Sequence, residues 1–186
     1  MSAKWIWAAV AVVVIVAGLW WAGVFNRASN QGAAVVLINS AAQADPTLSN
    51  SALKGAVASI DVQLAAVSKN VTALGSAPTK VQISAAASSV ASASTAMTAL
   101  SNKLRSRSVN AKTAGTAVPP AQIFSDLANQ ISNANSAAST AQKNTATSSP
   151  TTATLSASAS QLKTAQSDLV AARADIQSIF QTLGIN

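Results

Sequence analysis

The sequence of 186 residues contains no cysteine, histidine, tyrosine or glutamate, and charged residues make up only 9% of it. Without cysteine there is no disulfide framework, iron–sulfur cluster or thiolate zinc site. Without histidine and glutamate, the usual general bases and the imidazole ligands of metals are missing as well. We therefore expect neither an enzyme nor a protein that carries a cofactor or metal.

Small residues dominate what is present, since Ala, Ser and Thr together supply 85 of the 186 residues. The hydroxyl groups have no base beside them that could turn one into a nucleophile. The length suits one modest domain. No motif in this chain points to a known family.

Residues 5–25 form an apolar run of 21 residues without a charged side chain. At about 1.5 Å per residue a helix of this length spans roughly 30 Å, the thickness of the hydrocarbon core of a bilayer. Trp5, Trp7, Trp20 and Trp21 lie within the run on both sides of its apolar centre, as expected for side chains that anchor a helix at both membrane interfaces. The sequence predicts a single transmembrane helix within an anchor at residues 1–27.

The alternative is a cleaved signal peptide, which the short segment before residue 5 would suit. The run is long for a signal peptide and ends in bulky Trp20 and Trp21, and the nearest small-residue site, at residues 32–34, comes late. Lys4 precedes the run and Arg27 follows it. With the amino terminus added to Lys4, the positive-inside tendency predicts a cytoplasmic N-terminus in a cell (inner) membrane and an extracytoplasmic, periplasmic remainder.

Proline and glycine divide the rest of the chain into segments near 46–75, 78–109, 120–146 and 150–184. Asp45-Pro46 and Ser149-Pro150 each resemble an N-cap followed by proline at the first helical position. Gly75 to Pro78 marks the end of one helix and the start of another, and a looser break runs from residue 110 to 120.

Apolar residues in the four segments recur at alternating steps of three and four, the heptad period of helices that pack side by side. These seam positions are Leu53, Val57, Ile60, Leu64, Val67, Val71 and Leu74, then Ile83, Ala86, Val90, Ala93, Met97, Leu100 and Leu104, then Phe124, Leu127, Ile131, Ala134, Ala138 and Ala141, and finally Leu155, Leu162, Ala165, Leu169, Ala172, Ile176, Ile179 and Leu183. The prediction is an all-α chain: the anchor, a linker or short helix at 28–45, and an antiparallel up-down four-helix bundle at 46–186 with coiled-coil-like heptad seams.

Antiparallel pairing would gather the large side chains at one end of this bundle and leave the other end largely Ala, Ser and Thr. The linker decides which end faces the membrane: a collapsed linker puts the Leu- and Phe-rich end near it, and a rigid helix points that end away. The Ser- and Ala-rich segments 84–99 and 132–160 also resemble disordered low-complexity sequence. Their constant heptad phase favours helices instead.

Five aspartates are the only acidic residues. Asp45 fits a helix cap, while Asp168 and Asp175 are seven apart and share a helix face. With Asp61 or Asp126 from a neighbouring helix they could bind a hard cation. The favoured interpretation is a flanking carboxylate that meets a basic residue across the seam, which leaves no metal site.

The net charge is +7, and the only basic cluster is Lys103, Arg105, Arg107 and Lys112. A nucleic-acid surface is not expected, because no aromatic residues lie nearby to stack on bases. Contact with anionic lipid headgroups or an acidic partner is a stronger hypothesis for these four residues. The simplest interpretation is favourable positive charge near a helix C-terminus, with no ligand at all.

The leading functional hypothesis is a non-catalytic, single-pass membrane protein whose extracytoplasmic bundle is a structural or accessory subunit of a larger membrane-associated assembly. Its expected partners are the lipid bilayer and other membrane-protein subunits or copies of itself. One alternative is an extracytoplasmic sensing or ligand-binding bundle, which would need a cavity with convergent polar groups. Another is a viral or phage envelope-linked protein, whose sequence would have the same features.

Overall fold

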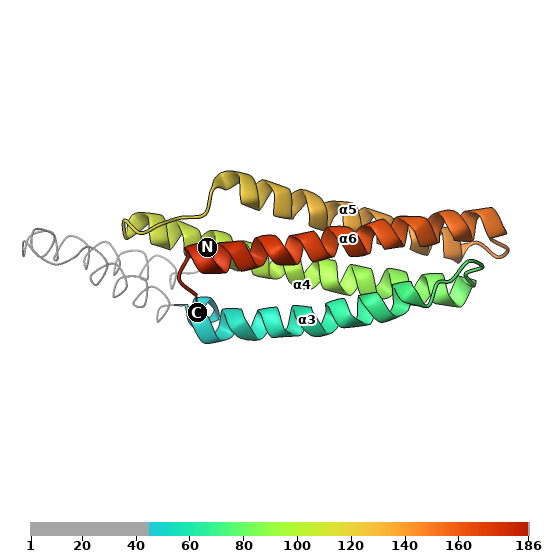
Figure 1. The fold of residues 1–186 in the computed structure, drawn as a ribbon, viewed down its shortest axis with the longest axis horizontal. Coiled ribbons are helices and arrows are strands. Elements are labelled where there is room, and N and C mark those ends of the chain that lie inside the picture. Colours follow the sequence, from blue (N-terminus) through green and yellow to red (C-terminus); the bar gives the residue numbers. More distant parts are fainter. Residues whose placement is uncertain (1–44, 186) are drawn as a thin grey trace, which may run out of the picture.

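The computed structural model describes residues 45–185, and this part of the chain is helical with no strand (Figure 1). A short 3-10 helix, η2 (Pro46–Leu48), precedes α3 (Asn50–Thr72), α4 (Lys80–Thr113), α5 (Ala121–Ala146) and α6 (Thr152–Thr182). The predicted all-helical architecture is confirmed for these residues, and their arrangement is consistent with a four-helix bundle. The predicted anchor, its four tryptophans and the linker lie outside the described residues.

The four helices lie lengthwise beside one another, and successive helices run in opposite directions (Figure 1). The contact between α5 and α6 is the most extensive of those between helices. The contact of α4 with α6 is larger than the contact of α3 with α6. Helices α4, α5 and α6 therefore form a close trio, with α3 packed mainly on α4. We call the end that holds Asp45, the C-terminus of α4 and the N-terminus of α5 the Asp45 end, and the opposite end the Pro78 end.

Side-chain caps set three of the helix starts. The hydroxyl of Ser49 accepts a hydrogen bond from the backbone N–H of Ala52 at 3.2 Å, so α3 begins after the 3-10 turn that Asp45 caps. Thr79 and Gln82 form a reciprocal capping box at the start of α4. The prediction that Ser149 caps the fourth helix is wrong: Thr151 does so, because its hydroxyl is placed to accept from the N–H of Thr154 at 3.1 Å.

Helix α4 ends later than the sequence breaks indicated. The predicted break from residue 110 is wrong, because α4 continues to Thr113. Gly115 then adopts a left-handed φ of 70°, and the N–H of Thr116 donates to the carbonyl of Ala111 at 3.0 Å. This pairing satisfies a carbonyl that the helix end would otherwise leave open. The glycine, rather than the residues before it, ends the helix.

The heptad seams form the core of the described residues. All the predicted seam positions are buried except Val57, Leu64, Leu155 and Leu183, which are half-buried and pack against the core. The period of 3.5 residues was therefore the correct guide to which face of each helix points inward.

The two ends of the core differ in side-chain size. Large buried residues gather at the Asp45 end: Leu48, Leu53, Leu100, Leu104, Phe124, Leu127, Ile176, Ile179, Phe180 and Ile185. At the Pro78 end α5 and α6 meet largely through alanines, with Leu162 buried among them and Leu155 half-buried beside the core. Helices α3 and α4 keep branched residues there, namely Val67, Val71, Leu74 and Ile83. The predicted Ala-rich end is thus a property of the α5–α6 half.

Candidate functional site

Arg107 ties the start of the described chain to α4. Its side chain is only 3% exposed, and its guanidinium donates to the carbonyl of Leu48 at 3.4 Å and to the amide oxygen of Asn50 at 3.2 Å. Burial lowers the pKa of Arg107 from its ordinary value, because the charged form loses contact with water. The guanidinium stays protonated at neutral pH. Arg107 is therefore an internal contact of the Asp45 end.

Arg105 points toward α5 instead. Its Nη2 donates to the carbonyl of Phe124 at 2.7 Å, and the guanidinium carbon lies 4.9 Å from the centre of the Phe124 ring. This distance fits a cation–π contact. The side chain remains exposed, so Arg105 both fixes α5 against α4 and presents its charge to solvent.

The four basic residues of the predicted contact site do not share one surface. A helix turns about 100° per residue, so Lys103 and Arg107 lie on the side of α4 opposite Arg105 and Lys112. Lys103 is half-buried and Lys112 is exposed. The structure thus brings Arg105 and Lys112 onto one exposed face, and it places Arg107 inside the bundle. The spacing along the helix alone could have predicted that Arg105 and Lys112 share a face that Lys103 and Arg107 do not.

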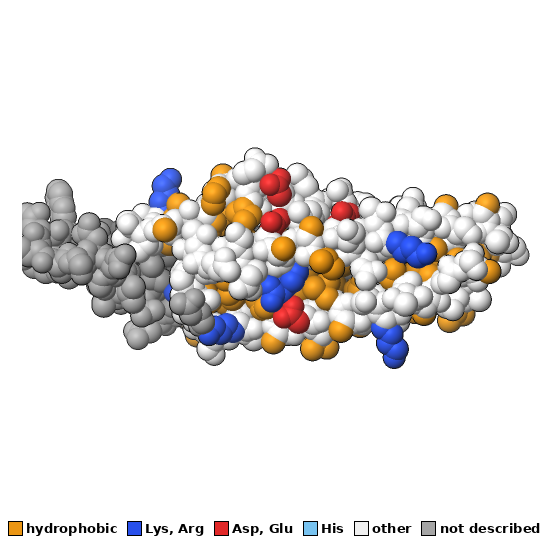
Figure 2. Space-filling model, in the orientation of Figure 1, with side chains coloured by type: hydrophobic (Ala, Val, Ile, Leu, Met, Phe, Trp, Pro, Cys, Tyr) orange, Lys and Arg blue, Asp and Glu red, His pale blue; other side chains and the backbone are white. Residues whose placement is uncertain are grey.

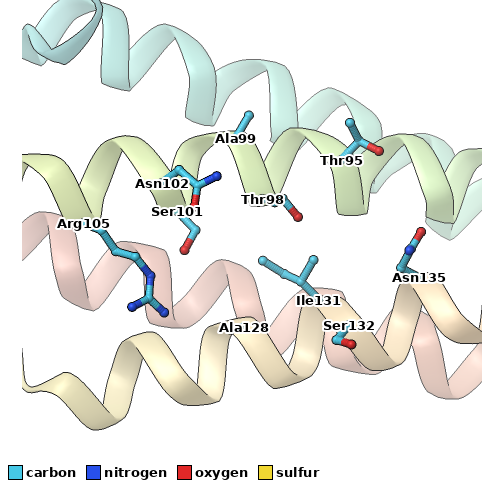
Figure 3. A pocket seen from close by; sticks show the side chains of 10 residues that line it. All are labelled: Thr95, Thr98, Ala99, Ser101, Asn102, Arg105, Ala128, Ile131, Ser132 and Asn135. Atoms are coloured by element: carbon cyan, nitrogen blue, oxygen red, sulfur yellow. The ribbon is translucent and has the colours of Figure 1, made fainter. Parts of the chain in front are cut away.

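An open groove lies between α4 and α5 and has a volume of about 580 Å³ (Figure 3). Its α4 wall carries Thr95, Thr98, Ala99, Ser101, Asn102 and Arg105, and its α5 wall carries Ala128, Ile131, Ser132 and Asn135. Ser101 and Ile131 form its buried floor. The lining offers hydroxyls, amides and one guanidinium, which can hydrogen-bond a ligand or a neighbouring helix.

Sequence reasoning missed this groove. The signal that could have found it is the polar residues at helical spacing on facing surfaces, such as Thr98, Ser101, Asn102 and Arg105 on α4. Ser132 and Asn135 continue the pattern on α5. Helices whose small polar residues meet leave room between them that larger side chains would fill.

Asp61 and Arg173 form an ion pair that links α3 to α6. The Nε of Arg173 lies 2.7 Å from Oδ1 of Asp61, and Nη2 lies 3.2 Å from Oδ2. Both side chains are partly exposed. Figure 2 shows basic and acidic side chains scattered among uncharged and hydrophobic ones on the face of the bundle in view.

The expected contact of Asp168 and Asp175 with a basic residue across the seam is absent from residues 45–185. These two aspartates lie on the side of α6 turned away from Arg173, toward α5, whose single basic residue is Lys143 near the Pro78 end. Asp126 instead accepts a hydrogen bond from Gln122 at 2.8 Å. Within the described part of the chain, no three acidic residues stand close enough to hold a metal ion.

One helix among the described residues has the length and composition of a membrane-spanning helix. There, α4 is the helix that is long and apolar enough to cross a membrane by length and composition, and its apolar face is buried in the bundle. The core helix of a bundle satisfies the same criteria. The predicted interface anchors Trp5, Trp7, Trp20 and Trp21 lie outside the described residues.

No protein-family model matches this sequence, and comparisons with curated proteins and with solved structures find no match.

Proposed function

We propose that this chain is a non-catalytic, single-pass membrane protein whose extracytoplasmic bundle acts as a structural or accessory subunit of a larger membrane-associated assembly. The observation that supports it best is the difference between the two ends of the bundle. The Asp45 end, which the chain enters from the apolar run at residues 5–25, is also the end with the large core side chains.

The buried contacts of Arg107 strengthen this argument. They hold Leu48 and Asn50 against α4 only a few residues after the chain enters the bundle at Asp45. A domain fixed in a bilayer by one end receives any pull through that end, so its best-packed contacts are most useful there. Buried hydrogen bonds to a charged group and large apolar side chains both resist local unfolding.

The rest of the bundle surface favours packing against another protein. The walls of the α4–α5 groove carry small side chains that let another helix approach closely. Val62, Val81 and Val170 are each more than half exposed on three different helices. Burial of such surface against a partner or a second copy would stabilise a bundle whose own core contains many alanines.

The α4–α5 groove also favours a second candidate, an extracytoplasmic bundle that binds a small ligand. Its volume of about 580 Å³ falls in the range of roughly 300–1,000 Å³ that ligand sites occupy. Convergent hydroxyls and amides with Arg105 at one end would suit a polar ligand that carries negative charge.

Membrane insertion is tested with the full chain in cells. We expect it to remain with membranes after alkaline extraction, and a Val13→Asp/Ile15→Asp variant to be released, because charge in the middle of the run opposes insertion. The chain has no cysteine, so a Ser76→Cys variant reports the location of the bundle. A membrane-impermeant maleimide should label it in intact cells. Extraction of the unaltered chain, or labelling only after lysis, would contradict the proposal.

The assembly role is tested by purification in mild detergent with chemical cross-linking. A defined oligomer or a stoichiometric partner supports it. A monomer whose melting temperature rises with small anionic ligands, with the rise abolished by Ser132→Leu in the groove, would support the ligand-binding candidate instead. Ala128→Ser in the same wall is the control that keeps the groove open.

A further inference from the structure

The C-terminal part of α4 combines exposed positive charge with exposed apolar side chains. Helical spacing puts Arg105, Val109 and Lys112 on one face, within about 60° of each other at 100° per residue. Val109 is 64% exposed, and Val118 in the following loop is 38% exposed. We call these four residues the α4 tip.

The last turn of α4, which carries Val109 and Lys112, projects beyond the start of α5. Arg105 contacts Phe124, so the antiparallel register sets the first residue of α5, Ala121, level with Ser108. Residues 109–113 of α4 therefore extend past α5, and the loop that follows them turns back at Gly115. Figure 1 shows this overhang at the Asp45 end of the bundle.

The same end carries the connection to the apolar run. Arg107 holds Leu48 beside α4, so the chain joins the bundle at the same end as the α4 tip, on the other side of α4. Residues 26–44 separate the run from Asp45. Nineteen residues span about 28 Å as a helix and about 25 Å on average as a random coil, whereas α4 with 34 residues is about 51 Å long. With a linker that is not a rigid helix, an anchored chain would keep the Asp45 end nearer to the bilayer than the Pro78 end.

We propose that the α4 tip docks on the anionic surface of the bilayer in which the chain is anchored, an inference that rests on the proposed membrane anchor. Arg105 and Lys112 are attracted to acidic headgroups within a Debye length of about 8–10 Å. Lys54 on α3 adds positive charge near this end, and Asp45 and Asp126 are carboxylates of opposing charge there. Val109 and Val118 then meet the apolar boundary below the headgroups.

The mixture of side chains favours lipid over other acidic partners. Single-stranded nucleic acids stack their bases on aromatic side chains, and none is exposed at the α4 tip, where Phe124 is buried beneath Arg105. Valines between cations fit an interface that is charged at its surface and apolar just below it.

The test uses the full chain, with Val109→Cys carrying an environment-sensitive nitrobenzoxadiazole label, in phosphatidylcholine vesicles with or without phosphatidylglycerol. We expect phosphatidylglycerol to shift the emission to the blue and to reduce iodide quenching at least twofold, and high salt to reverse both effects. The same label at Ser76→Cys, at the Pro78 end, should not respond. Lys112→Gln, and Arg105→Gln with Lys112→Gln, should remove the response, whereas Lys69→Gln with Lys143→Gln should retain it.

Co-flotation in the same samples separates this inference from the anchor. If the chain floats with neutral and anionic vesicles but the label at position 109 ignores phosphatidylglycerol, docking is wrong and the anchor stands. If it floats with neither, the proposed membrane function fails. A response of equal size in neutral vesicles, or one at position 76 instead, overturns the charge-dependent contact. Shielding found only in native membranes and lost on protease treatment assigns the α4 tip to an acidic protein and also overturns the proposal.

Discussion

The two ends of the bundle use different means to hold their helices together. At the Asp45 end, residues such as Leu53, Leu104 and Phe180 fill the core, and a buried guanidinium links η2 to α4. At the Pro78 end, alanines let α5 and α6 approach closely but bury little apolar area each. The comparison teaches that helix proximity and stability are separate quantities, because the hydrophobic contribution follows the area removed from water.

Truncation of one leucine at each end should give the largest measurable difference. Leu104 and Leu162 are both fully buried, at the Asp45 end and the Pro78 end respectively. We expect Leu104→Ala to lower the free energy of unfolding by about 4 kcal/mol and Leu162→Ala by about 2 kcal/mol, within the range for buried leucines. The smaller loss reflects alanine neighbours that can close around the gap. Denaturant unfolding of the full chain in mild detergent, followed by circular dichroism, measures both.

Equal losses for the two leucine variants would show that the bundle unfolds as one cooperative unit with similar packing at both ends. A larger loss for Leu162→Ala would reverse the comparison. Amide exchange gives an independent reading, since the backbone of the Pro78 end should exchange faster in the unaltered chain.

Replacement of Arg107 tests the polar contribution to the Asp45 end. Arg107→Met keeps the length of the side chain but removes its donors to Leu48 and Asn50. We expect a loss of about 2 kcal/mol, because a buried carbonyl loses a charged donor, and faster exchange of the Leu53 amide. Arg105→Met, on an exposed residue, is the matched control with a smaller expected loss. Unchanged stability of Arg107→Met would mean that the cost of burying the charge offsets its hydrogen bonds.

The Asp61–Arg173 pair should give the smallest effect. Its carboxylate is half exposed, so a double-mutant cycle with Asp61→Asn and Arg173→Gln should yield a coupling of about 0.5 kcal/mol that decreases with added salt. The pair lies in the middle of the bundle, between the two ends being compared. A coupling well above 1 kcal/mol would show that α3 depends on α6 more than their limited contact indicates.

The sequence was sufficient to predict the helical class and the inward faces, and it predicted the difference in side-chain size between the two ends correctly for α5 and α6. These follow from heptad spacing, which depends only on the order of residues. The ends of the helices were harder to predict from the sequence. The choice between Ser149 and Thr151 as the cap of α6, for example, depends on the conformation of the α5–α6 loop.

The candidate site was predicted less well than the fold. Arg105, Arg107 and Lys112 are neighbours in sequence, yet their contacts depend on which helix each one faces. The Asp61–Arg173 pair joins residues 112 positions apart. Only the packing of α3 beside α6 brings them together, and no local sequence pattern predicts a contact between residues so far apart in the chain.

The hydrogen bond from the Asn144 amide to the Ser158 hydroxyl, at 2.9 Å, fixes the alignment of α5 with α6. In a row of alanines, a slide of one helix along the other by seven residues exchanges one methyl group for another, so shape alone selects weakly among alignments. Ser158 is fully buried and also donates to the carbonyl of Thr154 at 2.9 Å, so its hydroxyl is an immobile acceptor for the amide. A single polar contact thus selects one register for two helices whose alanine-rich seam would otherwise allow several.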